Sequence, residues 1–222
     1  MQRHALYNED TLVIGLGRFG TAVATEMHRM GYRVHAIEAR ASLAERHHRR
    51  FQHVMAVDST DPEELGRAKL EMFRVAVVAI GSSVEASLLT AGNLVDAGVP
   101  SIWAKAVSEE HARILERIGV HHVVFPEADS GRRVAHLVND KLRDYIEFDD
   151  GYAIVKMTPP HELLDKTLAE SQVRSRYGVT VVGMKAPGDD FHHAVPGTMV
   201  GRHHSIIVSG PVAAIERLAS RP

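Results

Sequence analysis

The sequence contains no cysteine, and this absence excludes several kinds of chemistry. Disulfides, thiolate metal sites and cysteine nucleophiles cannot form, as is typical of proteins from a reducing compartment. No apolar run approaches the roughly 20 residues that span a bilayer, and the first ten residues lack the apolar core of a signal peptide. We therefore expect a soluble, cytoplasmic protein that reaches a membrane only through a partner.

The chain also lacks an excess of either charge. Its 26 Lys and Arg residues nearly balance 28 Asp and Glu residues, which gives no reason to expect nucleic acid as a partner. A hydrophobic content of 45% in 222 residues is enough for one or two domains. The 15 histidines include several adjacent pairs. Adjacent residues do not share a face of a helix or strand, so we expect most of these histidines to be solvated.

A glycine-rich segment follows the first apolar run, residues 12–14. It has the pattern G-x-G-x-x-G at Gly15, Gly17 and Gly20. The first glycine permits a tight turn, the second lets a pyrophosphate approach the backbone, and the third lets a helix pack on the sheet. The helix expected over residues 18–30 would point its N-terminal N–H groups at the anion. The pattern predicts nucleotide binding; the alternative is a fold that keeps the glycines for packing alone.

A second apolar segment, residues 32–37, ends in an acid at the spacing that such a nucleotide site requires. Glu38 follows the last glycine by roughly 20 residues, where a carboxylate accepts hydrogen bonds from a ribose diol. An acid there disfavours a 2′-phosphate and therefore NADP, whereas Arg40 nearby is a weak signal in the other direction.

The first 146 residues continue to alternate between apolar and helix-forming segments with short connections. Further strands are expected over residues 54–57, 74–81, 101–106 and 121–125, and helices over 41–50, 63–69, 82–97 and 109–118. Repeated βα units predict an α/β fold with a Rossmann-like, doubly wound parallel sheet and right-handed crossovers. A long helix is expected from about residues 129–132 to 146, packed on its own sheet or acting as a crossover and dimer-forming helix.

The pattern changes near residues 147–151, where turn-forming residues precede shorter segments. Strands are expected over 152–157, 177–185 and 205–209, with helices over 163–170 and 211–219. Shorter strands joined by turns are typical of antiparallel pairing. We therefore expect two domains: residues 1–146 for nucleotide binding, and residues 147–222 as a small α+β C-terminal lobe.

Several segments resemble the RCK family, the regulators of potassium conductance typified by the nucleotide-binding subunits of Ktr and Trk potassium uptake systems. They are GLGRFG (15–20), DSTD (58–61), VVAIG (77–81), IWAKA (102–106), RILERIGVHHVVFPEADSGRRVA (113–135) and VRSRYGVTVVG (173–183). The resemblance extends over nearly the whole chain, and among these proteins the sequence is most similar to the Ktr subunit. It implies a homo-oligomer, built from dimers into an octameric ring, that docks on a membrane-embedded K⁺-translocating subunit.

The resemblance also implies a role for particular residues. The glycine loop would cradle the phosphates, with Arg18 reaching a terminal phosphate across a subunit interface and so distinguishing ATP from ADP. Glu38 would hold the ribose, and Asp58 would lie at the adenine end. Lys105 would lie at the carboxyl end of a strand, where ligands bind in this architecture. The remaining expected contacts are Phe19, Arg40, Ser59 and Gly81.

Two further ligands are implied in the same way. Glu127 matches an acid that contributes to a Mg²⁺, Ca²⁺ or Na⁺ site between subunits, and a carboxylate is a suitable hard ligand. The alternative for Glu127 is an acid that faces a helix N-terminus. Arg174 and Arg176, beside the strand expected from residue 177, match the region where some relatives bind cyclic di-AMP; the alternative is a pair of surface charges.

The residues and the resemblance together predict a regulatory subunit that senses ATP and ADP, with NAD(H) as a further candidate ligand. An NAD-dependent oxidoreductase is the competing hypothesis, and it needs an acid or base beside the nicotinamide. Ser83, Glu85 and Lys105 are the available side chains, and we assign no catalytic residue. A sensor for a different cation transporter would use the same residues with another partner.

Overall fold

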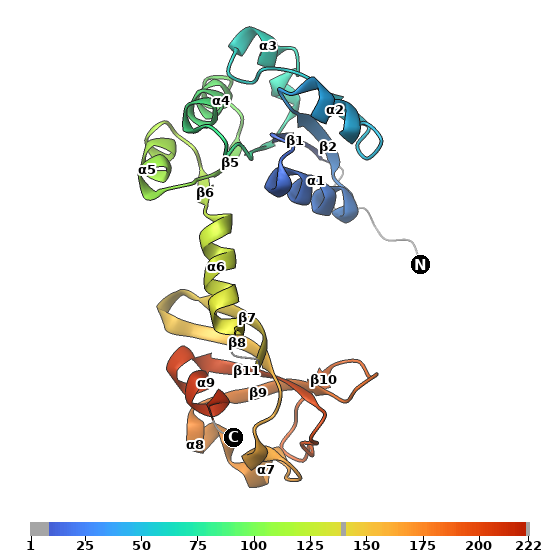
Figure 1. The fold of residues 1–222 in the computed structure, drawn as a ribbon, viewed down its shortest axis with the longest axis vertical. Coiled ribbons are helices and arrows are strands. Elements are labelled where there is room, and N and C mark those ends of the chain that lie inside the picture. Colours follow the sequence, from blue (N-terminus) through green and yellow to red (C-terminus); the bar gives the residue numbers. More distant parts are fainter. Residues whose placement is uncertain (1–8, 139–140, 221–222) are drawn as a thin grey trace. The chain divides into compact units, whose positions relative to one another are not determined.

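A six-stranded parallel sheet forms the centre of the N-terminal part of the chain in the computed structural model, which describes residues 9–138 and 141–220 (Figure 1). The strand order is β3-β2-β1-β4-β5-β6, so the direction of winding reverses between β1 and β4. The strands are β1 (Asp10–Ile14), β2 (Arg33–Ile37), β3 (His53–Met55), β4 (Val75–Val78), β5 (Ser101–Lys105) and β6 (His122–Val124). The expected doubly wound parallel sheet is confirmed.

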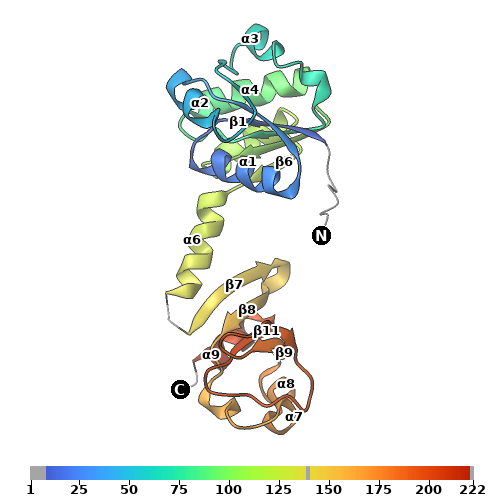
Figure 2. The same ribbon diagram turned by 90° about the vertical axis from the view of Figure 1, so that its right-hand side faces the viewer.

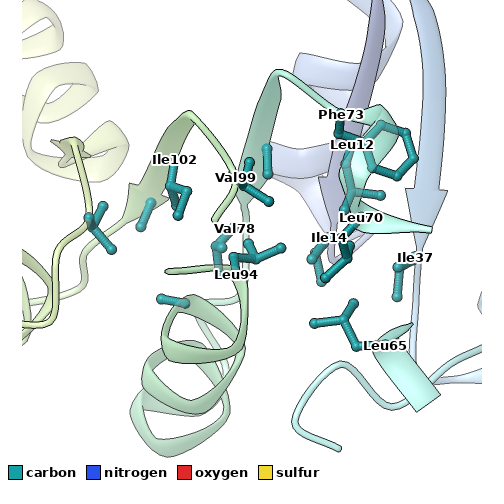
Figure 3. Close-up of a cluster of buried hydrophobic side chains, with 14 of the residues drawn as sticks. Leu12, Ile14, Ile37, Leu65, Leu70, Phe73, Val78, Leu94, Val99 and Ile102 are labelled. Carbon is teal, nitrogen blue, oxygen red and sulfur yellow. The ribbon is translucent and has the colours of Figure 1, made fainter. Parts of the chain in front are cut away.

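Helices cover both faces of this sheet, because its central strands are apolar on both sides. The helices are α1 (Arg18–Met30), α2 (Ala41–His47), α3 (Pro62–Gly66), α4 (Val84–Asp96) and α5 (Glu109–Arg117), with a short 3₁₀ turn, η1 (Leu70–Met72). Leu12 and Ile14 of β1 point into a core shared with α3, α4 and α5 (Figure 3). Val13 between them points to the opposite core, under α1 and α2.

Side-chain caps fix where several of these helices begin. The Asp61 carboxylate accepts hydrogen bonds from the first turn of α3, with Pro62 at the first helical position. Ser83 and Ser108 accept backbone hydrogen bonds at the starts of α4 and α5. Gly31, in the left-handed conformation with φ 100°, ends α1. These caps therefore set the ends of the helices that surround the sheet.

A helix, α6 (Pro126–Leu137), leads from the parallel sheet into a five-stranded antiparallel sheet of order β10-β9-β11-β8-β7 (Figure 2). Its strands are β7 (Leu142–Phe148), β8 (Tyr152–Met157), β9 (Thr180–Lys185), β10 (His192–His193) and β11 (Ser205–Pro211). The helical segments are α7 (Leu168–Ser171), α8 (Val173–Tyr177), α9 (Val212–Ala219) and the 3₁₀ turns η2 (Asp149–Gly151) and η3 (His161–Leu163). The expected α+β lobe is confirmed.

The helix expected to continue to residue 146 ends at Leu137, and the prediction is wrong over residues 142–146, which belong to β7; residues 139 and 140 lie outside the described residues. Leu142 and Tyr145 lie three residues apart, which indicates one face of a helix, yet both belong to β7 and both are buried. A β-bulge resolves the conflict: they pair with Met157 and Val155, two residues apart on β8. The chain divides into two compact units between Glu127 and Ala128.

Two local expectations in the C-terminal unit are also wrong. The helix expected over residues 163–170 is replaced by η3 and α7, which are separate short turns. The strand expected from residue 177 begins at Thr180, so Arg174 and Arg176 lie within α8 rather than beside a strand opening. Among the residues that the structure describes, no helix is long and apolar enough to cross a bilayer.

Candidate functional site

A cleft with a volume of about 380 Å³ opens where β1, β2, β4 and β5 end. It lies at the point where the strand order reverses, the position at which doubly wound sheets bind ligands. The expected site residues of this unit line the cleft, apart from one glycine; they are Gly15, Gly17, Arg18, Phe19, Glu38, Arg40, Asp58, Ser59, Gly81, Lys105 and Glu127.

The glycine loop is shaped for an anion at the start of α1. Gly15 adopts φ +93°, a left-handed conformation that favours glycine. A Cβ atom on Gly17 would meet nothing within 4 Å, so the backbone there is open to close approach. No described side chain caps α1, and its first turn contains no acid. Its N-terminal N–H groups are therefore available to a phosphate.

Gly20 is the expected residue that does not line the cleft. A Cβ atom at this position would lie 1.9 Å from the Gly15 carbonyl oxygen and 2.9 Å from the Ala79 Cβ atom. The third glycine of the pattern therefore allows α1 to pack directly against the loop and the end of β4, as its position in the motif predicts.

Glu38 holds the glycine loop in place in this structure. Its Oε2 atom accepts the Leu16 N–H at 2.8 Å, and its Oε1 atom accepts the Arg40 backbone N–H at 3.1 Å and Nε–H at 2.9 Å. Burial works to raise the pKa of the carboxyl, but the hydrogen bonds from Arg40 and Leu16 outweigh it and hold the pKa below its ordinary value. The carboxylate that would receive a ribose thus already positions the loop.

Lys105 brings a buried cation to the cleft from the end of β5. The residue is only 9% exposed, and its Nζ atom lies 2.5 Å from Glu127 Oε1 and 6.0 Å from the centre of the Phe19 ring. A Cβ atom on Gly81 would lie 2.9 Å from Nζ, so this glycine makes room for the lysine. Lys105, helped by Arg18, holds the pKa of Glu127 below its ordinary value. A buried ammonium with one acidic partner can donate further hydrogen bonds to an anionic ligand.

The loop after β3 forms another wall of the cleft. Asp58 Oδ1 accepts hydrogen bonds from the Thr60 N–H at 3.0 Å and the Thr60 hydroxyl at 2.7 Å, which together lower the pKa of Asp58. The Ser59 hydroxyl instead pairs with Thr90 of α4 at 2.8 Å and is buried. Ser59 therefore borders the cleft while its hydroxyl is bound elsewhere.

Several residues that line the cleft were not among those predicted. They are Ile14, Ile37, Ala39, Thr60, Ala79, Ile80, Ser82 and Ala86. Most lie at or directly after the carboxyl end of a strand, and this position is the signal that could have identified them.

The described residues do not by themselves provide a metal centre. No group of three or more histidine, aspartate or glutamate side chains among them is placed to hold an ion. Glu127 is mostly exposed and fits the role of a single oxygen ligand, although in this structure it is paired with Lys105. Any cation bound there needs further ligands from a nucleotide, water or another subunit.

The two arginines proposed for a second ligand have different surroundings. Arg174 lines a cavity of about 420 Å³ together with residues of α7, β9 and the segment 194–196. Arg176 donates to Glu162 at 3.3 Å and lies over the Tyr177 ring, with its guanidinium carbon 5.2 Å from the ring centre. Residues two apart on a helix point in different directions, so this structure does not bring the pair together.

Together, the fold and the cleft define a Rossmann-type domain with a phosphate-binding loop, followed by a small antiparallel lobe. The chain belongs to the TrkA-N domain family, whose model matches residues 11–126. It is 31% identical over 211 residues to Ktr system potassium uptake protein A of Bacillus subtilis (strain 168), covering 95% of each chain. This confirms the expected family.

Solved structures share the fold over almost the whole chain. The GsuK RCK domain matches with a TM-score of 0.67 at 16% identity, covering 96% of this chain and 48% of that one. The GsuK channel bound to NAD matches with a TM-score of 0.67 at 17% identity, covering 96% of this chain and 40% of the channel chain. This chain thus spans less than half the length of those two proteins.

Proposed function

We propose that this chain is a nucleotide-sensing regulatory subunit of a potassium transporter and has no enzymatic activity. The observation that carries the proposal is the cleft at the switch point, where open backbone at Gly17 and a buried Lys105 offer two anchors for phosphates. The likeness to a Ktr potassium uptake protein over 95% of both chains supports the transport role.

The lining of the cleft suggests how ATP or ADP would bind. The start of α1 and Lys105 would hold the phosphates, Glu38 would face the ribose, and Asp58 would face the adenine. Arg18, exposed at the first position of α1, would meet the third phosphate of a nucleotide in a neighbouring subunit. Glu127 would contribute one ligand to a Mg²⁺, Ca²⁺ or Na⁺ ion that offsets the phosphate charge.

Regulation would follow from assembly. We expect dimers that form an octameric ring on the inner face of the membrane, docked on the membrane-embedded K⁺-translocating subunit. Exchange of ATP for ADP would favour one shape of the ring over the other, because a ligand shifts an equilibrium only if it binds one state more tightly. Arg18 would supply that difference by contacting the third phosphate in only one arrangement.

A calorimetric titration with ATP, ADP and NADH, with and without Mg²⁺, tests the proposal. We expect ATP and ADP to bind more tightly than NADH, with the Mg²⁺ effect larger for ATP. The NADH titration is included because the GsuK channel, which shares this fold, has been solved with NAD bound. Failure of all three nucleotides to bind would refute nucleotide sensing, and a clear preference for NADH would make a hydride-transfer screen the next experiment.

Cyclic di-AMP is a second candidate ligand for the C-terminal lobe. The cavity beside Arg174 is large enough for part of such a ligand and carries one cation in its wall. Cyclic di-AMP carries two phosphates, which favours a site at the interface between two lobes. Each subunit would then contribute one arginine to one phosphate. Titration of the intact protein with cyclic di-AMP, compared with AMP, tests this assignment.

A further inference from the structure

The loop after β3 is a preorganised unit rather than a flexible connection. Asp58 closes a turn by accepting two hydrogen bonds from Thr60, and the Asp58 N–H donates to Glu64 Oε2 at 3.0 Å. Asp61 caps α3 by accepting the Glu63 N–H at 2.8 Å. These contacts join the loop to α3 and fix its internal shape. They do not hold it against the rest of the sheet.

Helix α4 provides the missing anchor. The Asn93 amide nitrogen donates to the carbonyl oxygens of Ser59 at 3.0 Å and Thr60 at 3.1 Å. A side-chain amide has two N–H groups, and here each finds an acceptor. Three residues earlier on the same helix, the Thr90 hydroxyl bonds to the Ser59 hydroxyl at 2.8 Å, and both residues are buried. Adjacent turns of α4 therefore hold the loop, Thr90 at Ser59 and Asn93 at both Ser59 and Thr60.

The identity of residue 93 is informative because asparagine is a weak helix former. It lies inside α4, where alanine or leucine would favour the helix more. Its amide is directed at two carbonyl groups of a loop that lines the cleft. Ala86, in the first turn of α4, also lines the cleft, so one helix both borders the cleft and anchors this loop.

We propose that Asn93 is a positioning residue for the nucleoside end of the cleft and acts through the carbonyl groups of Ser59 and Thr60. The inference rests on the proposed function, in which Asp58 faces the base. Asn93 fixes where the Asp58 carboxylate stands, and Thr90 assists from the adjacent turn. The phosphate end is built from other parts, the glycine loop and Lys105, which Asn93 does not contact in this structure.

This division of the cleft makes the proposal testable with two ligands. Loss of the Asn93 anchor should weaken the binding of ADP, which carries the base, and leave the binding of inorganic pyrophosphate unchanged. A general loss of stability in the domain should instead weaken the binding of both ligands. The informative variants are Asn93→Asp, which keeps the shape but turns a carboxylate toward two carbonyl oxygens, and Asn93→Ala, which removes the donor. Leu89→Ala, at a 49% exposed position of the same helix, is the matched control.

The measurement is the affinity of each purified full-length variant for ADP and for pyrophosphate by calorimetry, with urea unfolding as a check on folding. We expect ADP to bind about tenfold more weakly to both Asn93 variants, as loss of two neutral hydrogen bonds implies. Pyrophosphate should bind them within about twofold of the unchanged protein. Leu89→Ala should match the unchanged protein with both ligands.

Three results separate the alternatives. Equal losses for ADP and pyrophosphate, or unchanged ADP affinity, would overturn the role of Asn93 while the proposed function stands. Failure of the unchanged protein to bind ADP would overturn both. Thr90→Val removes the second anchor without altering Asn93 and should weaken ADP selectively as well. This variant decides the matter if the Asn93 variants do not fold.

Discussion

Replacing Glu38 with glutamine tests how the glycine loop is held. The carboxylate is 6% exposed and accepts three hydrogen bonds, one from the loop at Leu16 and two from Arg40. Glutamine has nearly the same shape but a single acceptor oxygen and no charge. The glutamine oxygen can accept from the Leu16 N–H or from the Arg40 donors, but not from both. The amide hydrogens of the glutamine then face the donors that are left without an acceptor.

The expected loss follows from the kind of bond that is removed. Hydrogen bonds to a charged group each contribute about 1.5–3 kcal/mol, and a buried N–H left unpaired costs a similar amount. The Arg40 side chain is exposed, so its share is small. We therefore expect Glu38→Gln to lower the free energy of unfolding by about 2 kcal/mol at pH 7 in the absence of nucleotide.

The pH dependence provides an independent check on the same reasoning. The folded-state pKa of Glu38 is lowered, so its stabilising contribution is present above the unfolded-state pKa and disappears as the pH falls through the folded-state pKa. The stability difference between the unchanged protein and Glu38→Gln should therefore be constant from pH 7 to about 5 and shrink below about pH 4.

Urea unfolding followed by circular dichroism at several pH values measures both effects. Glu45→Gln, at an exposed position of the neighbouring helix α2, is the matched control and should change the unfolding free energy by less than about 0.5 kcal/mol. A difference for Glu38→Gln that is near zero at pH 7, or that stays constant down to pH 3.5, would show that the carboxylate charge does not hold the loop.

Four other substitutions test the cleft and the glycine loop beside it. Gly20→Ala places a methyl group 1.9 Å from the Gly15 carbonyl oxygen, so we expect about 3 kcal/mol lower unfolding free energy by urea titration. Gly17→Ala meets no neighbour within 4 Å and should leave stability within about 1 kcal/mol while weakening nucleotide binding in calorimetry. Arg18→Ala should weaken the binding of ATP more than that of ADP. Equal losses of affinity for the two nucleotides would exclude a contact between Arg18 and the third phosphate. Lys105→Met should weaken ATP and ADP alike, about tenfold or more.

The parallel sheet could be predicted because its signals are local and repeated. Each apolar run is short, and caps or glycines end the helices between runs. The carboxyl ends of parallel strands meet at one edge, so residues such as Glu38, Asp58 and Lys105 could be grouped without knowing any contact. What could not be predicted is which of these side chains are already engaged with the protein, because the partners Leu16, Thr60 and Glu127 are set by loop geometry.

The antiparallel lobe shows where the pattern fails. Leu142 and Tyr145 repeat at helical spacing, and only the bulge in β7 places them on one face of a sheet. A bulge has no clear signature in a single sequence, since it inserts one residue without a required residue type. The resemblance also placed Arg174 and Arg176 at one site, and closeness along the chain does not reveal that they point in different directions from α8.

The pairing of Lys105 with Glu127 suggests how an occupied cleft could affect the rest of the chain. Glu127 lies in the first turn of α6, the helix that runs on into the C-terminal unit. In this structure its carboxylate neutralises Lys105, the buried cation at the edge of the cleft. A phosphate that bound Lys105 would compete for this ion pair and leave Glu127 free to bind a cation or water. A ligand that displaced Glu127 from Lys105 would therefore act at the start of α6, and two ligands would differ in that effect only if they bound Lys105 with different strength.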